Sequence, residues 1–314
     1  MLKTLVAIAA AAGLACAAAP ASTPTRSIPL GVSISGVAVG GLSSEPARAR
    51  VEAAFERSIR VTFRHHNIWI SPERLGAGLS VDAAVTSALA ATPDSRIALP
   101  VRYSGMQVAG VVKRLARRFD RAAVDSTVTG ATESGPVYSE AKAGLAVDRR
   151  TMASALGQVL RDGTRAPLTL LTHPVAPVRT PDTFGLVIVI TRGTNTLRLY
   201  RGRALVRSFR VATGQAIYPT PAGVWRIVDK QRNPWWYPPT QDEWARGLKP
   251  VPPGPSNPLG TRWMGLNAPG VGIHGTDAPA SIGYSASHGC VRMQVPEAEW
   301  LFERVTVGTP VVIL

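Results

Sequence analysis

Cysteine is scarce in this chain: its 314 residues include two, Cys16 and Cys290. Cys16 lies in a stretch that we expect to be removed on export, so no intrachain disulfide is expected in the mature protein. Exported proteins usually pair their cysteines. A single remaining thiol therefore indicates an intermolecular bridge, a reactive group or a buried inert side chain. The residues around Cys290 must decide between these.

Acidic residues are also few: 20 Asp and Glu stand against 35 Lys and Arg, and the formal net charge is +15. The basic residues are nearly all arginine and are scattered, and no basic run alternates with aromatic residues. A nucleic-acid partner is therefore not expected. An anionic cell envelope is the more natural counterpart, although a general effect on solubility explains the charge equally well. The pattern implies no stable protein partner.

The N-terminus has the pattern of a secretory signal peptide over residues 1–21. Lys3 precedes the apolar run "TLVAIAAAAGLACAAA", and the small residues of "APAS" follow, with cleavage expected after Ala21. The run is short for a bilayer span. Two alternatives remain open: a lipid anchor on Cys16, although Gly13 stands where a larger aliphatic residue is usual, and an uncleaved anchor. The protein is thus expected to be exported to the periplasm or cell wall, outside the cytoplasmic membrane.

Residues 28–180 are expected to form an α+β domain with a weak internal repeat. The segment "AGLSVDAAVTSAL" at 77–89 returns as "AGLAVDRRTMASAL" at 143–156, and each copy predicts a turn, an amphipathic helix and a strand. Asp82 and Asp148 are expected to cap the two helices. The segment contains no acid pair, metal cluster or nucleophile, which indicates a binding or spacing role.

Residues 184–314 are expected to form a mostly-β domain. Short β-rich runs with turns between them, "GLVIVI", "TLRLY", "LVRSFRVATG" and "GVWRIV", predict strands, and "GTPVVIL" predicts the strand that closes the sheet. A short helix is expected near the end, with Pro296 at its first position and Trp300 and Leu301 facing the core. The proline-rich stretch 219–258 predicts a lid or groove wall.

The segment "IHGTDAPASIGYSASHGCVRM" at 273–293 surrounds Cys290 with candidate catalytic groups. A thiol reacts as its thiolate, and an imidazole within hydrogen-bond reach can take the proton and return it to a leaving amine. His274 and His288 are both candidates for that base. Gly275 and Gly289 let backbone approach a substrate and leave N–H groups free to face an oxyanion. Zinc bound by Cys290 and the two histidines is the alternative, but the paired cysteines usual at such sites are missing.

These motifs closely resemble the L,D-transpeptidase catalytic domain, also called the YkuD-like domain. The likeness rests on "IHGT" followed by "SHGCVRM" and extends through "LRLYRG", "VATG", "NPWWYPP", "PPGPSNPLGTRWMGL" and "VGTPVVIL", over residues 184–314. It implies a β-sandwich with a short helix and a lid loop. The "GVSISGVAVGGL" opening and both "AGLxVD" units resemble the peptidoglycan-binding domain that often precedes such enzymes. For residues 28–180, glycan binding and plain spacing both stay open.

The resemblance also implies roles for the site residues. Cys290 would be the nucleophile, His274 the general base, and the Gly275 carbonyl the group that orients the imidazole. His288, Gly289 and Ser287 would support the loop and the oxyanion. Arg292 would hold a substrate carboxylate or anchor the catalytic loop. No metal or organic cofactor is needed.

The implied reaction is peptidoglycan cross-linking. Cys290 would attack the carbonyl of the diamino acid at position three of a stem tetrapeptide, release D-alanine, and pass the acyl group to an amine of a neighbouring stem, making a 3→3 cross-link. Water as acceptor would make the enzyme a carboxypeptidase, and a lipoprotein amine would make it an attachment enzyme. Carbapenems are expected to acylate the same thiol. A non-catalytic envelope-binding protein is the alternative from another class.

Overall fold

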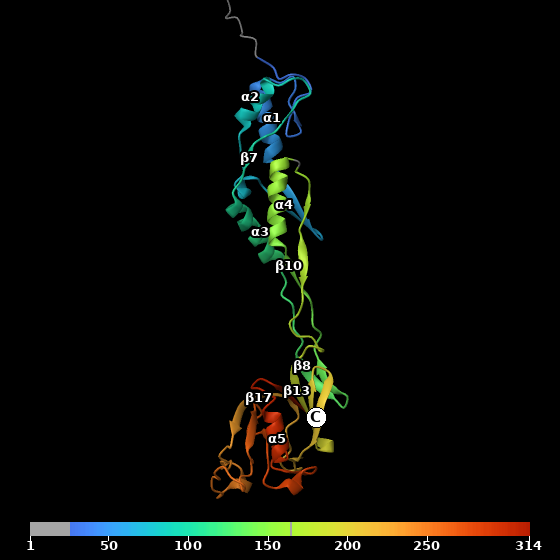
Figure 1. Ribbon diagram of the computed structural model, residues 1–314, viewed down its shortest axis with the longest axis vertical. Helices are drawn as coiled ribbons and strands as arrows, with labels where there is room; N and C mark the ends of the chain where they lie inside the picture. Colours follow the sequence, from blue (N-terminus) through green and yellow to red (C-terminus); the bar gives the residue numbers. More distant parts are fainter. Residues whose placement is uncertain (1–25, 164) are drawn as a thin grey trace, which may run out of the picture. The chain divides into compact units, whose positions relative to one another are not determined.

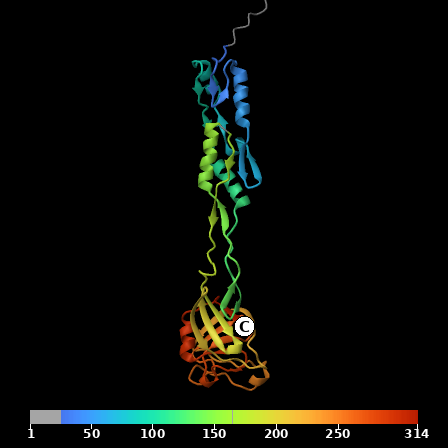
Figure 2. The ribbon, with the colours of Figure 1, turned by 90° about the vertical axis from the view of Figure 1, so that its right-hand side faces the viewer.

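The computed structural model describes residues 26–163 and 165–314. The expected signal peptide and Cys16 lie outside this range. The described chain forms two compact units, which Figures 1 and 2 show in two orientations. Unit 1 comprises residues 26–118 and 147–171, and unit 2 comprises residues 119–146 and 172–314. Within the described ranges, no helix is both long enough and apolar enough to cross a membrane.

Unit 1 mixes helices with short strands. Its α-helices are α1 (Ser44–Glu56), α2 (Val81–Leu89), α3 (Gly105–Phe119) and α4 (Arg149–Asp162), with the 3-10 turn η1 (Glu73–Leu75). Its strands are β1 (Ser33–Ile34), β2 (Val37–Ala38), β3 (Ile59–Phe63), β4 (His66–Ile70), β5 (Gly78–Leu79), β6 (Arg96–Ile97), β7 (Val101–Arg102) and β11 (Leu168–Thr169). They form three small sheets, in the orders β2-β1-β6, β11-β3-β4 and β5-β7.

The two "AGLxVD" segments each run from a strand into a helix, but not in the same register. In the second copy, β10 (Gly144–Val147) leads to Asp148, whose carboxylate accepts the Thr151 N–H at 3.0 Å and caps α4 as predicted. In the first copy, β5 ends earlier and the N-cap residue of α2 is Ser80. The cap predicted for Asp82 is therefore wrong: this residue lies inside the first turn, where it forms an ion pair with Arg48.

Unit 2 is built mostly from sheet. An eight-stranded curled sheet has the order β15-β14-β13-β22-β17-β18-β19-β21. Its strands are β13 (Leu186–Thr191), β14 (Thr196–Arg201), β15 (Ala204–Arg210), β17 (Gly223–Arg232), β18 (Arg262–Leu266), β19 (Gly272–His274), β21 (Val291–Arg292) and β22 (Pro310–Ile313). The strands predicted from the β-rich runs are confirmed. The last strand, β22, pairs in parallel with β13 and antiparallel with β17. It therefore lies in the interior of the sheet, between these two strands, and not at an edge.

The remaining elements of unit 2 are short. They are β8 (Val128–Thr132), β9 (Gly135–Tyr138), β12 (Thr172–Val175), β16 (Thr213–Gly214), β20 (Ser285–Ser287), helix α5 (Val295–Phe302) and the 3-10 turns η2 (Arg192–Thr194), η3 (Glu243–Ala245) and η4 (Pro279–Ser281). In α5, Pro296 is the second helical residue rather than the first. Leu301 is fully buried and Trp300 packs against the core, as predicted.

The hairpin β8–β9 lies in unit 2, although it precedes residue 180 in the chain. The Tyr138 hydroxyl donates to the carbonyl of Gly202 at 2.7 Å, and Arg198 donates to the carbonyl of Glu133 at 2.9 Å. The expected boundary between residues 180 and 184 therefore falls inside a compact unit.

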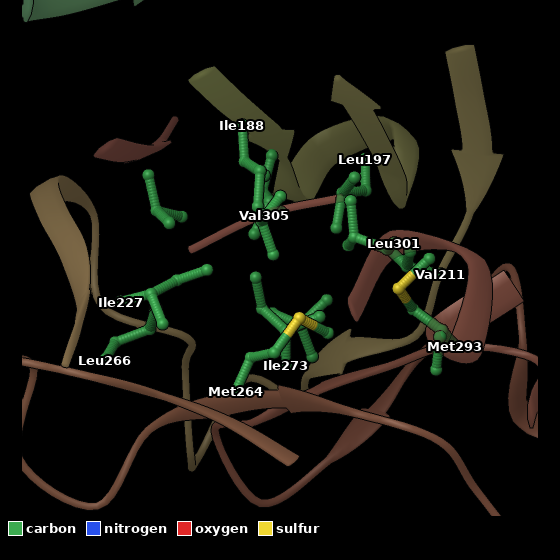
Figure 3. Packing of buried hydrophobic residues seen from close by; sticks show 14 of the residues in the cluster. Ile188, Leu197, Val211, Ile227, Met264, Leu266, Ile273, Met293, Leu301 and Val305 are labelled. Atoms are coloured by element: carbon green, nitrogen blue, oxygen red, sulfur yellow. The ribbon is translucent and has the colours of Figure 1, made fainter. Parts of the chain in front are cut away.

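One face of the large sheet covers the hydrophobic core of unit 2. Figure 3 shows Ile227, Met264 and Ile273, from three neighbouring strands, gathered in this core with Val305 and Leu301. Because successive side chains on a strand point to opposite faces, the residues next to them face away from the core. That opposite face carries the candidate site.

Candidate active site

The pairing of β19 with β21 brings Cys290 and His274 to one face. The two strands are parallel, with Ile273 opposite Val291 and His274 opposite Arg292. Ile273 and Val291 are fully buried in the core. The alternation of side chains therefore directs His274, Arg292 and Cys290, which directly precedes Val291, away from the core. All three line a pocket of ≈ 1110 Å³.

His274 is buried, with 4% of its surface exposed, and is held by its neighbour. Its Nδ1 lies 2.5 Å from the carbonyl oxygen of Gly275. Because a carbonyl can only accept, Nδ1 carries the proton and Nε2 keeps its lone pair. The pKa of His274 is lowered to about 4, mainly by burial. The hydrogen bond with the Gly275 carbonyl raises this pKa, and the charge of Arg292 lowers it. At neutral pH the imidazole is thus a neutral proton acceptor.

Cys290 is half-buried and has no disulfide partner within the described residues. Its Sγ lies 3.5 Å from the carbonyl oxygen of Gly270. Burial raises the pKa of the thiol, while a hydrogen bond with the Gly272 backbone and the charge of Arg292 lower it. The first effect is the largest, so the resting pair is a thiol beside a neutral imidazole.

Ser287 holds the turn that carries Cys290. Its buried hydroxyl donates to the Cys290 carbonyl at 2.5 Å and accepts the Gly289 N–H at 3.2 Å. The Gly275 N–H donates to the carbonyl of Arg262 at 3.3 Å. Neither glycine N–H is therefore free for an oxyanion, unlike the expectation from the sequence. The Cys290 N–H has no hydrogen bond to any residue that the structure describes, which leaves it available to a ligand.

His288 belongs to the aromatic wall of the pocket. Its ring stacks on Trp244, with centroids 4.0 Å apart and an interplanar angle of 15°, and lies 5.1 Å from Tyr218. Burial lowers the pKa of His288 and so does Arg292, while Asp242 raises it. Trp244 comes from the proline-rich stretch, which also contributes Trp235, Trp236 and Tyr237 to the pocket lining. The stretch thus forms a wall of the groove.

The backbone of Arg292 anchors its strand, while its side chain lines the pocket. Its N–H and carbonyl exchange hydrogen bonds with Ala212, both at 2.9 Å, and these anchor the strand. Its guanidinium makes no ion pair with any residue in the described ranges. The side chain therefore remains available for an anionic ligand.

Two residues of the pocket were not identified from the sequence. Trp263 stacks on His274, with ring centroids 5.8 Å apart, and Asp229 lines the same pocket from β17. The alternation in "RWMGL" could have placed Trp263 on the face opposite Met264. Asp229 lies 61 residues before Cys290, and no local signal connects the two. Among residues 26–163 and 165–314, no group of three or more His, Cys, Asp or Glu side chains could hold a metal ion.

A thiol beside a neutral imidazole in one pocket is the arrangement that cysteine-dependent enzymes use. Residues 185–313 match the YkuD family, the L,D-transpeptidase catalytic domain. The YkuD protein of Bacillus licheniformis is 32% identical over 170 residues, 54% of this chain and 90% of that protein. ErfK/SrfK of Salmonella typhimurium is 37% identical over 146 residues, 43% of this chain and 46% of that protein. Both are L,D-transpeptidases by name.

Among solved structures, that of a mutant L,D-transpeptidase from Enterococcus faecium has a TM-score of 0.38 and 18% sequence identity. It covers 85% of this chain and 98% of that one. Because the match to the Bacillus licheniformis protein covers 90% of that protein at 32% identity, the chain belongs to the L,D-transpeptidase family. Its catalytic domain occupies residues 185–313, and the family acts on peptidoglycan.

Proposed function

We propose that this protein is a peptidoglycan L,D-transpeptidase that forms 3→3 cross-links through a thioester on Cys290. The observation that carries the proposal is the placement of Cys290 and His274 on adjacent parallel strands, on one face, in one pocket. The Gly275 carbonyl holds the imidazole in the tautomer whose Nε2 can accept a proton. Family membership supports the same reaction.

In the first half-reaction, His274 takes the thiol proton and Cys290 Sγ attacks the carbonyl of the diamino acid at position three. The Cys290 N–H stabilises the oxyanion, and Ser287 keeps the turn in place through the Cys290 carbonyl. The C–N bond then breaks, and D-alanine leaves as the amine with the proton returned by His274. Arg292 binds a carboxylate of the substrate. The product of this step is an acyl thioester.

In the second half-reaction, an amine of a neighbouring stem peptide attacks the thioester. His274 accepts a proton from that amine, the C–S bond breaks, and the thiol is regenerated. Water as acceptor would yield a tripeptide instead, and a lipoprotein amine would yield an attached lipoprotein. The aromatic wall around His288 partly shields the thioester from solvent, which favours an amine that is bound by the pocket over free water.

The protein is proposed to act outside the cytoplasmic membrane, in the periplasm or cell wall, where its substrate lies. The signal-peptide pattern and the net charge of +15 support this placement. The part of residues 28–180 that belongs to unit 1 would bind or approach the anionic envelope and so keep the catalytic unit near the stem peptides. Fractionation of cells that express the full chain tests the placement, and recovery in the cytoplasm would refute it.

The reaction is tested by incubating the purified protein with sacculi rich in tetrapeptide stems and identifying the muropeptides by mass spectrometry. We expect 3→3 dimers with the wild type and none above blank with Cys290→Ala. Tripeptides without dimers would assign water as the acceptor. A β-lactam of the carbapenem class should add once to the wild type and not to Cys290→Ala. Dimer formation by Cys290→Ala would refute the mechanism.

A further inference from the structure

A row of residues crosses the pocket beside His274 and ends at Cys290. Asp229 of β17 lies opposite Gly265 of β18, and Gly265 lies opposite Gly272 of β19. Gly272 precedes Ile273 just as Cys290 precedes Val291, the partner of Ile273. Residues opposite one another point to the same face of a sheet. Asp229 and Cys290 therefore stand at the two ends of one row, with two glycines between them.

The glycines of this row make room for the ring of Trp263. A Cβ on Gly272 would collide with the six-membered part of the indole, and a Cβ on Gly265 would lie 2.8 Å from its Nε1. Neither glycine has a positive φ, so the requirement is for space rather than for backbone freedom. The indole thus lies across the row and forms a flat, apolar floor between Asp229 and Cys290.

Asp229 places a negative charge at the far end of this floor. Its carboxylate is half-buried, and its Oδ2 accepts a hydrogen bond from Gln231 Nε2 at 2.7 Å. It makes no ion pair within the part of the chain that the structure describes. Arg292 lies near Cys290 at the other end. The groove therefore has a cationic end beside the thiol and an anionic end beyond an apolar floor.

The spacing of the row matches the length of a diamino-acid side chain. Three strand spacings of about 4.8 Å separate the Cα atoms of Asp229 and Cys290 by roughly 14 Å. A hydrogen bond of about 3 Å at one end and an attack distance of about 3 Å at the other leave roughly 8 Å. Six bonds, mostly of about 1.5 Å, join the carbonyl carbon of a diamino acid to its side-chain nitrogen and span roughly 7–8 Å when extended.

We propose that Asp229 binds the side-chain ammonium group of the donor diamino acid whose carbonyl Cys290 attacks, with the methylene groups of that side chain on Trp263. The assignment rests on the proposed function and adds a specificity residue to it. Gln231 orients the carboxylate. A donor without the amine leaves Asp229 unpaired and gains only the apolar contact.

The test compares donor tetrapeptides that differ only in the side-chain amine at position three. Two pairs are used: lysine against norleucine, and diaminopimelate against 2-aminopimelate. The measured quantity is kcat/KM for acylation of Cys290, followed through D-alanine release. The wild type should prefer the amine-bearing donor by about tenfold or more, the range for a charge-assisted hydrogen bond.

Three variants separate the possible sources of that preference. Asp229→Asn keeps the size and removes the charge, and it should bring the ratio close to one. Asp229→Glu keeps the charge and should keep most of the preference. Asp242→Asn removes the other carboxylate of the pocket lining and should retain the wild-type ratio. Thermal unfolding checks the fold of each variant, and Asp229→Ala replaces Asp229→Asn as the variant without the charge if Asp229→Asn does not fold.

An unchanged ratio in Asp229→Asn, or its loss in Asp242→Asn alone, would overturn the assignment and leave the transpeptidase intact. A wild type that turns over both members of a pair equally would also overturn it. Absence of any acylation of wild-type Cys290, by peptides and by a β-lactam that has no diamino side chain, would refute the proposed function and this inference with it.

Discussion

Replacing His274 by glutamine should remove a pH-dependent part of the stability of this protein. In the folded chain the pKa of His274 is lowered from 6.5 to about 4, mainly by burial. Between these values the unfolded chain binds a proton that the folded chain does not. Stability contributed by the neutral imidazole is therefore complete above about pH 6.5 and is lost as the pH falls toward about 4.

The size of the effect follows from the shift. A difference of about 2.5 pKa units corresponds to roughly 3 kcal/mol at the acid limit. Between about pH 7 and pH 5, the linkage gives a loss of about 2 kcal/mol in the wild type. Glutamine does not titrate, so His274→Gln should lack this component while keeping a side-chain hydrogen-bond donor for the Gly275 carbonyl. Urea unfolding of both proteins across this range measures the difference.

The same pKa predicts the acid limb of catalysis. Acylation of Cys290 by a β-lactam needs the neutral imidazole, so its rate should hold down to about pH 5 and fall with a midpoint near 4. A titration of the His274 ring by NMR gives the pKa independently. A midpoint at or above 6.5, or the ultraviolet absorbance of a thiolate at neutral pH, would refute the thiol and neutral imidazole as the resting pair.

Three further substitutions, with Gly185→Ala as a control, test the packing of unit 2. Gly272→Ala drives a methyl group into the ring of Trp263 and should cost about 1–3 kcal/mol in urea unfolding, whereas Gly185→Ala, whose Cβ would meet nothing within 4 Å, should cost nothing. Ser287→Ala removes both hydrogen bonds of a buried hydroxyl, and β-lactam acylation should slow about tenfold; an unchanged rate would contradict its role in the turn. Tyr138→Phe loses the bond to Gly202 and should cost about 1 kcal/mol, and no loss would show that the β8–β9 hairpin does not stabilise unit 2.

The sequence by itself determined the mostly-β class of unit 2 and identified the candidate residues of the site. A leftover thiol and two nearby histidines have few alternative uses, so Cys290, His274 and His288 stood out before any geometry was known. The resemblance to the L,D-transpeptidase domain then singled out His274 as the expected base. The strands of unit 2 were predictable because β-rich runs between turn residues are a local signal. The alternation of side chains between the two faces of a strand is also a local rule, and it applies to Ile273 and Val291 once their strands are known.

Tertiary structure decided which distant residues meet. Asp229 and Trp263 come to the site through the register of β17, β18 and β19, which depends on backbone hydrogen bonds between strands far apart in the chain. The same holds for the β8–β9 hairpin, which joins unit 2 through contacts with Gly202 and Arg198. The Ser287 hydroxyl accepts the Gly289 N–H because the turn folds back on itself. Such pairings are set by the packing of whole elements, and no short stretch of sequence contains them.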